Sequence, residues 1–118
     1  MNMLTATDAR ARLEAAIGSS DDVFITDAVD RSVRLAELAD DIRSHTCEPF
    51  LVEAEVMAPG FPFAKVGERL SGYCIAFANG YWLVYQPNAD RFLCFWGESL
   101  AALGAHGVFG SPLSCWSA

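Results

Sequence analysis

The histidines and cysteines are the residues from which a nucleophile or a metal site would be built. His45 and Cys47 form the one close pair, and the sequence has no CxxC motif. The remaining members are spread along the chain as Cys74, Cys94, His106 and Cys115. A structural zinc site takes closely spaced pairs of ligands, which this spacing does not offer. We therefore expect no metal, no cofactor and no Cys-His catalytic pair, with reduced cysteines that pack as small apolar side chains.

Glu53 and Glu55 are the other candidates for chemistry, because they share one side of the alternating stretch at residues 50–57. Such a pair can act as general acid and base only if burial raises the pKa of one carboxyl. Alternation of this kind instead places the glutamates on the solvent side of a half-buried strand. The glycines of residues 104–110, "GAHGVFG", lack the lysine of a P-loop and are expected in turns. The sequence thus predicts no catalytic residue, and we do not expect an enzyme.

The aromatic residues between positions 81 and 96 allow two interpretations. They can fill the core of a sheet, which we favour, or they can line a ligand pocket, with Tyr81, Tyr85, Phe92 and Trp96 as its wall. A pocket also needs convergent polar groups, and beyond the tyrosine hydroxyls this stretch offers only Gln86 and Arg91. A small-ligand-binding protein or enzyme therefore remains an alternative, and a homodimeric subunit that pairs through an apolar sheet face is another.

Composition predicts one domain over residues 1–118. The chain is 53% hydrophobic and 19% charged, far from the composition of disordered chains. No stretch approaches the length of about 20 apolar residues that a membrane span requires. The N-terminal residues also lack the basic and apolar regions of a signal peptide. The sequence predicts a cytoplasmic protein without a membrane partner.

The excess negative charge lies entirely in the first half of the chain. The net charge is −7; residues 1–60 carry twelve acidic and five basic side chains, whereas residues 61–118 carry three of each. Binding of nucleic acid depends on clustered lysine and arginine, so nucleic acid is excluded as a partner. The acidic half instead favours a basic protein as partner.

Periodicity predicts an α+β fold in which two N-terminal helices pack on an antiparallel β-meander of four to five strands. Apolar residues at helical spacing predict helices over residues 7–17 and from 26 or 27 to 44, while residues 23–25 are left open between strand and core plug. The acidic helical half covers residues 1–48, and the sheet-forming half covers residues 49–118. A short helix or turn is expected at 98–104, followed by a final strand or an ordered tail.

The register of the meander follows from Asn79-Gly80, a dipeptide typical of a two-residue hairpin turn. This turn pairs Ala78 with Tyr81, and counting outward pairs Ile75 with Val84 and Cys74 with Tyr85. A four-residue loop at 87–90 then pairs Gln86 with Arg91 and continues to Trp82 opposite Phe95. In this register two interstrand spacings separate Cys74 from Cys94, so a disulfide between them is excluded.

Two acidic segments of the first half carry a resemblance. The segments are "SSDDVFITDAVD" and "AELADDIRS". In its size, its acidity and its lack of a catalytic motif, the chain resembles the immunity proteins that protect bacteria from their own toxins in interbacterial competition. The resemblance implies a cognate toxin as partner, with a basic nuclease, whose active site the inhibitor covers, as the expected kind. The attracting charges would be Asp21, Asp22, Asp30, Glu37 and Asp41, and the exposed apolar anchors would be Val33 and Phe61.

Overall fold

The fold is α+β, as predicted. In the computed structural model, residues 6–17, 30–78, 80–87 and 89–117 are described. Two helices precede a five-stranded sheet, and a short 3₁₀ turn and a third helix complete the order. The elements are α1 (Ala6–Ala16), α2 (Arg31–Ser44), β1 (Thr46–Val56), β2 (Arg69–Ala78), β3 (Tyr81–Gln86), β4 (Arg91–Trp96), η1 (Leu100–Ala102), β5 (Leu103–Gly110) and α3 (Pro112–Ser117).

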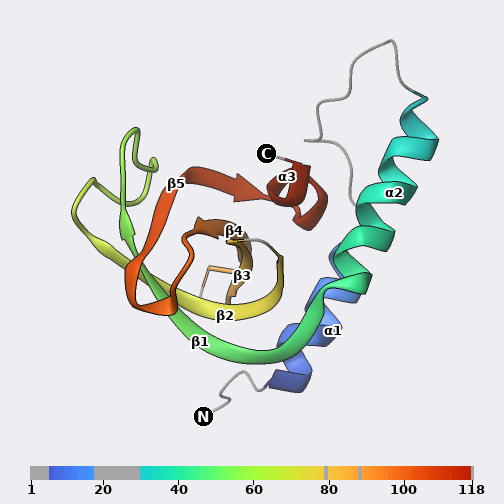
Figure 1. Ribbon diagram of the computed structural model, residues 1–118, viewed down its shortest axis with the longest axis horizontal. Helices are drawn as coiled ribbons and strands as arrows, with labels where there is room; N and C mark the ends of the chain where they lie inside the picture. Colours follow the sequence, from blue (N-terminus) through green and yellow to red (C-terminus); the bar gives the residue numbers. More distant parts are fainter. Residues whose placement is uncertain (1–5, 18–29, 79, 88, 118) are drawn as a thin grey trace.

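The sheet closes on itself. Strands β1 to β5 are antiparallel to their neighbours in chain order, and β5 returns to β1 as a parallel pair. This closing pair is short, because it joins Ala54–Val56 to Leu103–Ala105 only. Figure 1 shows the resulting barrel with the three helices gathered along one side. The meander was predicted from the sequence, but its closure through a parallel pair was not.

Closure gives the sheet an apolar inner face and an outer face that is apolar where the helices cover it. Apolar side chains from all five strands fill the inner face, among them Trp82, Val84, Leu93 and Phe95. The outer face packs Leu83, Tyr85 and Phe92 against the three helices. Five consecutive residues of β3, from Trp82 to Gln86, are therefore buried. The run "YWLVYQ" is apolar because it lies between two cores.

The register of β3 with β4 is the predicted one, from Gln86 opposite Arg91 to Trp82 opposite Phe95. The predicted register of β2 with β3 is confirmed from Ala78 to Ala76 and is wrong beyond Ala76. A bulge inserts Ile75, so that Cys74 and not Ile75 faces Val84. Ile75 and Cys74 therefore lie on the faces of the sheet opposite to those that the predicted pairing gives them. Ile75 packs with the helices, and Cys74 points into the barrel. A bulge bends its strand and increases the local twist, which a small barrel requires.

Three predicted boundaries change. Helix α2 begins at Arg31 instead of 26 or 27, since Asp30 has an extended backbone and caps the helix. Strand β1 begins at Thr46 instead of 50. The tail forms β5 and then the unpredicted helix α3, so Gly104, Gly107 and Gly110 lie in a strand and not in turns. Residues 23–25, for which a strand and a core plug are both left open, lie outside the described residues.

The cysteines behave as small apolar residues. All four are free, so no disulfide joins Cys74 to Cys94. Burial raises the pKa of the Cys74 thiol well above its ordinary range and that of Cys94 to about 12, so both thiols stay neutral.

None of the described helices is long and apolar enough to cross a lipid bilayer.

A polar network ties α1 to the turn between β3 and β4. Arg12 donates from Nε and Nη2 to the two Asp90 carboxylate oxygens at 2.7 and 3.2 Å. The Tyr85 hydroxyl donates to the same carboxylate at 2.6 Å. These hydrogen bonds, that of Arg12 foremost, lower the pKa of Asp90, while burial raises the pKa of Tyr85 to about 12. The network fixes α1 over the outer core.

The substitution Asp90→Asn tests this network. Because the folded-state pKa of Asp90 lies below its ordinary value of about 3.9, the carboxylate stabilises the fold above that pH and loses its effect as pH falls through the folded-state pKa. Asp90 and Arg12 are partly exposed, so we expect the variant to lose less than about 1 kcal/mol at pH 7. Urea unfolding from pH 7 to 3 measures the difference, which must shrink on acidification. A constant difference would show that Asp90 acts through packing alone.

Candidate functional site

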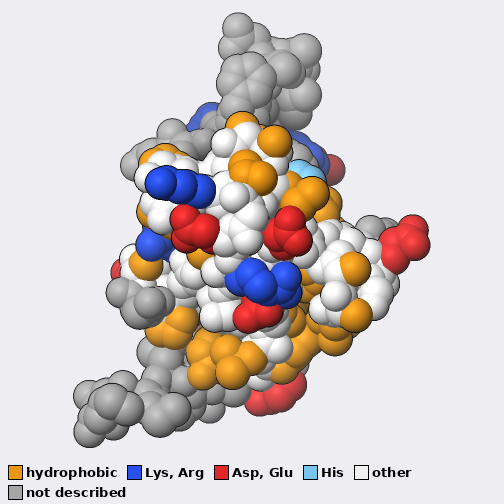
Figure 2. Space-filling model, turned by 90° about the vertical axis from the view of Figure 1, so that its left-hand side faces the viewer, with side chains coloured by type: hydrophobic (Ala, Val, Ile, Leu, Met, Phe, Trp, Pro, Cys, Tyr) orange, Lys and Arg blue, Asp and Glu red, His pale blue; other side chains and the backbone are white. Residues whose placement is uncertain are grey.

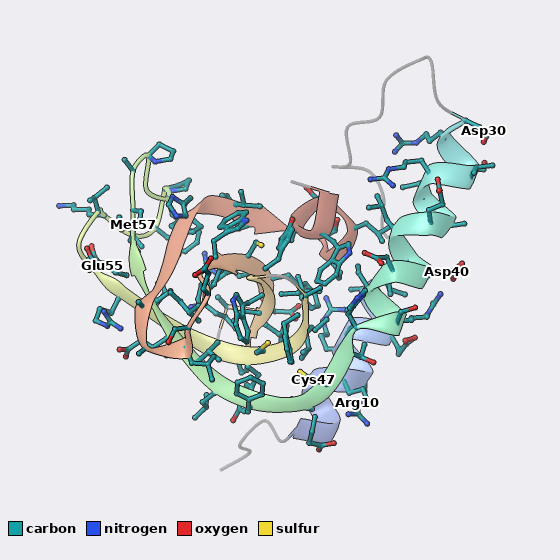
Figure 3. The ribbon with its side chains drawn as sticks, in the orientation of Figure 1. Arg10, Asp30, Asp40, Cys47, Glu55 and Met57 are labelled. Carbon is teal, nitrogen blue, oxygen red and sulfur yellow. The ribbon has the colours of Figure 1, made fainter. Side chains whose placement is uncertain are left out.

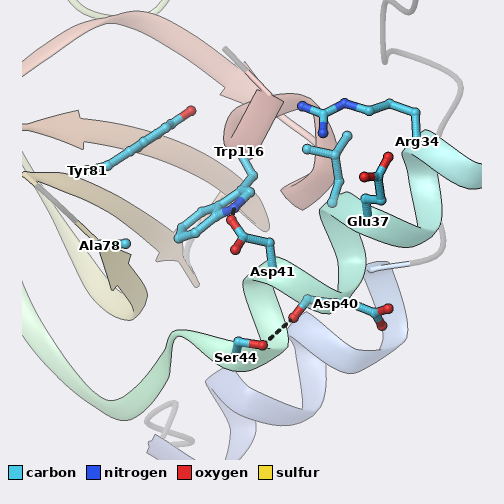
Figure 4. A pocket seen from close by; sticks show the side chains of 9 residues that line it. Arg34, Glu37, Asp40, Asp41, Ser44, Ala78, Tyr81 and Trp116 are labelled. Carbon is cyan, nitrogen blue, oxygen red and sulfur yellow. Dashed lines mark hydrogen bonds between the residues drawn. The ribbon is translucent and has the colours of Figure 1, made fainter. Parts of the chain in front are cut away.

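A cleft lies between α2 and one end of the barrel. Its volume is about 690 Å³. Helix α2 supplies one wall, whereas Ala78 of β2, Tyr81 of β3 and Trp116 of α3 supply the other. Figure 4 shows the two walls facing each other. The residues of the α2 wall are Arg34, Glu37, Leu38, Asp40, Asp41 and Ser44.

Helix α2 packs on the barrel through only part of its length. Leu38 and Ile42, one turn apart, are buried, whereas the first turn from Arg31 to Arg34 is exposed. Asp30 caps the helix by accepting the Val33 N–H at Oδ1, 3.1 Å away. Figures 1 and 3 show the capped end, labelled Asp30, standing away from the barrel. The cleft is the space that this divergence leaves.

The opposite wall is aromatic, and its polar atoms are already used. The rings of Tyr81 and Trp116 stack with centroids 5.2 Å apart, and Trp96 stacks on the other side of Tyr81 at 5.5 Å. The Tyr81 hydroxyl donates to the Cys115 carbonyl oxygen. This wall therefore presents apolar ring surface to the cleft.

One hydrogen bond holds the two walls together. The Trp116 indole Nε1–H donates to Asp41 Oδ2 at 2.7 Å, across 75 residues of sequence. The other Asp41 oxygen lies 3.5 Å from Nδ1 of His45, whose ring also contacts the Trp116 ring at 6.1 Å. A buried indole N–H needs an acceptor, which makes Asp41 part of the packing of α3.

The residues predicted on α2 are exposed, as expected. Asp30, Val33, Glu37 and Asp41 all reach the surface, and Val33 is 56% exposed. The structure brings Glu37 and Asp41 together in the cleft and leaves Asp30 and Val33 outside it. Arg31, Arg34 and Arg43 accompany these acids on the exposed surface of the helix. Asp21 and Asp22 lie outside the described residues.

Phe61 corrects one expectation, since it is not an exposed anchor. It is only 9% exposed and packs with the residues that fill the barrel. Its ring contacts Phe63 and Phe109, which are 36% and 41% exposed. The guanidinium of Arg91 lies 3.6 Å above the Phe63 ring. The loop that carries both phenylalanines folds back against the barrel, and Phe63 is its exposed aromatic residue.

The other candidates for chemistry are held in structural roles. Cys47 is half-buried, and burial raises the pKa of its thiol, which disfavours the nucleophilic thiolate. Glu53 is exposed and pairs with Arg69 at 2.5 Å, while Glu55 is exposed beside it. Neither carboxyl is buried as an acid-base pair would require. The described residues contain no group of three or more His, Cys, Asp or Glu that could hold a metal ion.

The aromatic set proposed as a pocket does not form one. Tyr85 and Phe92 are buried in the outer core, under the helices. Tyr81 and Trp96 pack against that core and reach two different clefts, Trp96 a smaller one of about 410 Å³ beside His106. Core packing thus accounts for these rings.

The face remote from α2 has no dominant charge. Figure 2 shows acidic and basic side chains interspersed along its middle, with hydrophobic patches above and below. In Figure 3, Glu55 and Met57 mark this side of the molecule, while Asp40 points away from the barrel on the α2 side.

Comparison with known proteins adds no relative. No family model, curated protein or solved structure matches the chain. The chemistry of the described residues is therefore the basis for a functional conclusion.

A double-mutant cycle tests the link between the two walls. We expect Asp41→Ala and Trp116→Phe each to destabilise the fold, with a coupling of about 0.5 to 1.5 kcal/mol because each variant removes the same hydrogen bond. Urea unfolding of the two single variants and the double variant gives the coupling. Asp40→Ala replaces the first variant in a control cycle, since its carboxylate points away from the cleft. Equal coupling in both cycles would contradict a direct contact.

Proposed function

We propose that this chain is a non-enzymatic inhibitor of the immunity type, which binds a basic bacterial toxin domain and covers its active site. The observation that carries the proposal is the position of its negative charge. All of the net charge of −7 belongs to residues 1–60, and the described acids Asp30, Glu37, Asp40 and Asp41 are exposed, beside Arg31, Arg34 and Arg43, on α2, whose first turn stands away from the barrel.

The rigidity of the scaffold supports this function. The barrel and the helices share well-filled cores, so α2 is presented on a fixed base. A preorganised charged surface accelerates association with a basic partner and costs little conformational entropy on binding. Val33, exposed on the same helix, adds an apolar contact that slows dissociation once it is buried. The expected complex is electrostatically steered and held by a few desolvated side chains.

The alternatives receive less support. A ligand-binding function based on the sheet aromatics is less favoured, because Tyr85 and Phe92 are buried in the outer core and Tyr81 and Trp96 reach two different clefts. A homodimer formed through an apolar sheet face has less surface to use, since three helices cover much of the outer face.

The identity of the neighbouring gene provides the first experiment. A toxin gene immediately upstream supports the proposal if co-expression of this chain restores growth of a bacterial host, and failure to restore growth contradicts it.

Charge reversal tests the position of the interface. We expect the double variant Asp30→Lys and Glu37→Lys to slow association with the toxin domain roughly tenfold and to flatten its salt dependence, because both charges contribute to steering. Stopped-flow kinetics between about 0.05 and 0.5 M salt provide the rates.

The matched control is the double variant Glu55→Lys and Glu98→Lys. It makes the same change in net charge with two exposed acids that lie outside α2. We expect it to slow association much less. Equal slowing by the two double variants would mean that only net charge matters, and it would contradict α2 as the binding element.

A further inference from the structure

We infer that the cleft between α2 and the aromatic wall accepts an arginine side chain of the basic partner. This inference rests on the proposed function, which it extends by naming the side chain that the cleft recognises. The volume of about 690 Å³ falls within the range of small-molecule sites, so there is room for one long side chain with its backbone.

The shape of the cleft matches the two parts of an arginine. Leu38, Ala78 and the rings of Tyr81 and Trp116 provide an apolar surface on which the methylene stem can pack. The polar atoms of that surface are engaged within the protein, Trp116 Nε1 with Asp41 and the Tyr81 hydroxyl with the Cys115 carbonyl oxygen. An entering stem therefore displaces water from ring surface and breaks no hydrogen bond.

The charged end of the arginine meets carboxylates on the helical wall. Glu37 lines the cleft, and among the described residues it has no hydrogen bond or ion pair. Asp41 is fixed by its bond to Trp116, so its charge is positioned before the partner arrives. Asp40 lies at the rim, 4.0 Å from Nη1 of Arg43. Because the Asp40 carboxylate points away from the cleft, Glu37 and Asp41 against Arg34 leave the cleft with a net charge of −1.

Arginine fits better than lysine for a geometric reason. A guanidinium presents a planar fork of donors that can bind a carboxylate through two parallel hydrogen bonds. The guanidinium is also less strongly hydrated than an ammonium, so it loses less hydration free energy when it leaves water beside an apolar wall. Arg34, on the same wall as Glu37, opposes the entry of a cation, and removal of its charge should strengthen binding.

The test uses N-acetyl-L-arginine methylamide as probe, with the citrulline analogue as its neutral isostere. In ¹H–¹⁵N NMR titrations the indole N–H of Trp116 reports on the cleft, and that of Trp82, bound to the Gly97 carbonyl oxygen at 2.9 Å, serves as reference. We expect saturable shifts of the Trp116 signal with a dissociation constant of about 1 to 10 mM. The citrulline analogue should leave both signals in place, and the lysine analogue should bind at least about threefold more weakly.

Two exposed substitutions give effects of opposite sign. Glu37→Gln should weaken probe binding roughly threefold to tenfold, whereas Arg34→Gln should strengthen it about twofold to threefold. A purely structural role of these residues would not produce opposite changes, and circular dichroism with thermal unfolding checks that both variants fold. Absence of saturable shifts, equal binding of citrulline, or the same change in both variants would overturn the inference.

The probe titration does not involve the toxin, so the two proposals can fail separately. Restored growth without arginine binding would contradict the cleft as an arginine site and leave the inhibitor function standing. Arginine binding without restored growth would support the site and contradict the proposed inhibitor.

Discussion

A sheet that closes into a small ring must be apolar on its inner face and wherever helices cover its outer face, and the rest of the molecule follows from that constraint. The inner face has to fill the ring with side chains, and the outer face has to seat three helices. Strand β3 shows the result, with five consecutive buried residues and the amide of its terminal Gln86 donating to the Ser71 carbonyl oxygen. Little of this strand remains for polar chemistry, so the exposed polar side chains lie on other elements, α2 among them.

The local parts of the fold could be predicted from the sequence. The Asn-Gly dipeptide at 79–80 and the sequence spacing around 87–90 predict strand pairing over a few residues, and the observed β3–β4 register is the predicted one. The bulge at Ile75 and the parallel closure depend on curvature, which pattern alone does not encode. Gly72 belongs to the same bend, since a Cβ there would lie 2.6 Å from the Val84 side chain. Alternation predicts a strand but not where that strand must bend.

The cleft also has one wall that the sequence predicts and one that it does not. The exposed residues of α2 could be predicted, because an amphipathic helix reveals its outer side through its own spacing. The second wall could not, since it depends on α3 returning to α2 after five strands. Trp116 gave a partial signal, because a tryptophan near apolar residues must bury its ring and find an acceptor for its N–H. Which carboxylate would accept that N–H was decided by packing, as was the burial of Phe61.

The separation of the cleft walls in sequence also links recognition to folding. Asp41 and Trp116 stand 75 residues apart, with the whole sheet between them. A ligand held between the walls has no counterpart site in the unfolded chain, so its binding free energy adds to the stability of the native state. Conversely, local opening of α3 removes one wall while most of the sheet stays paired. Ligand binding in the cleft and the folding of α3 against the barrel are thus thermodynamically coupled.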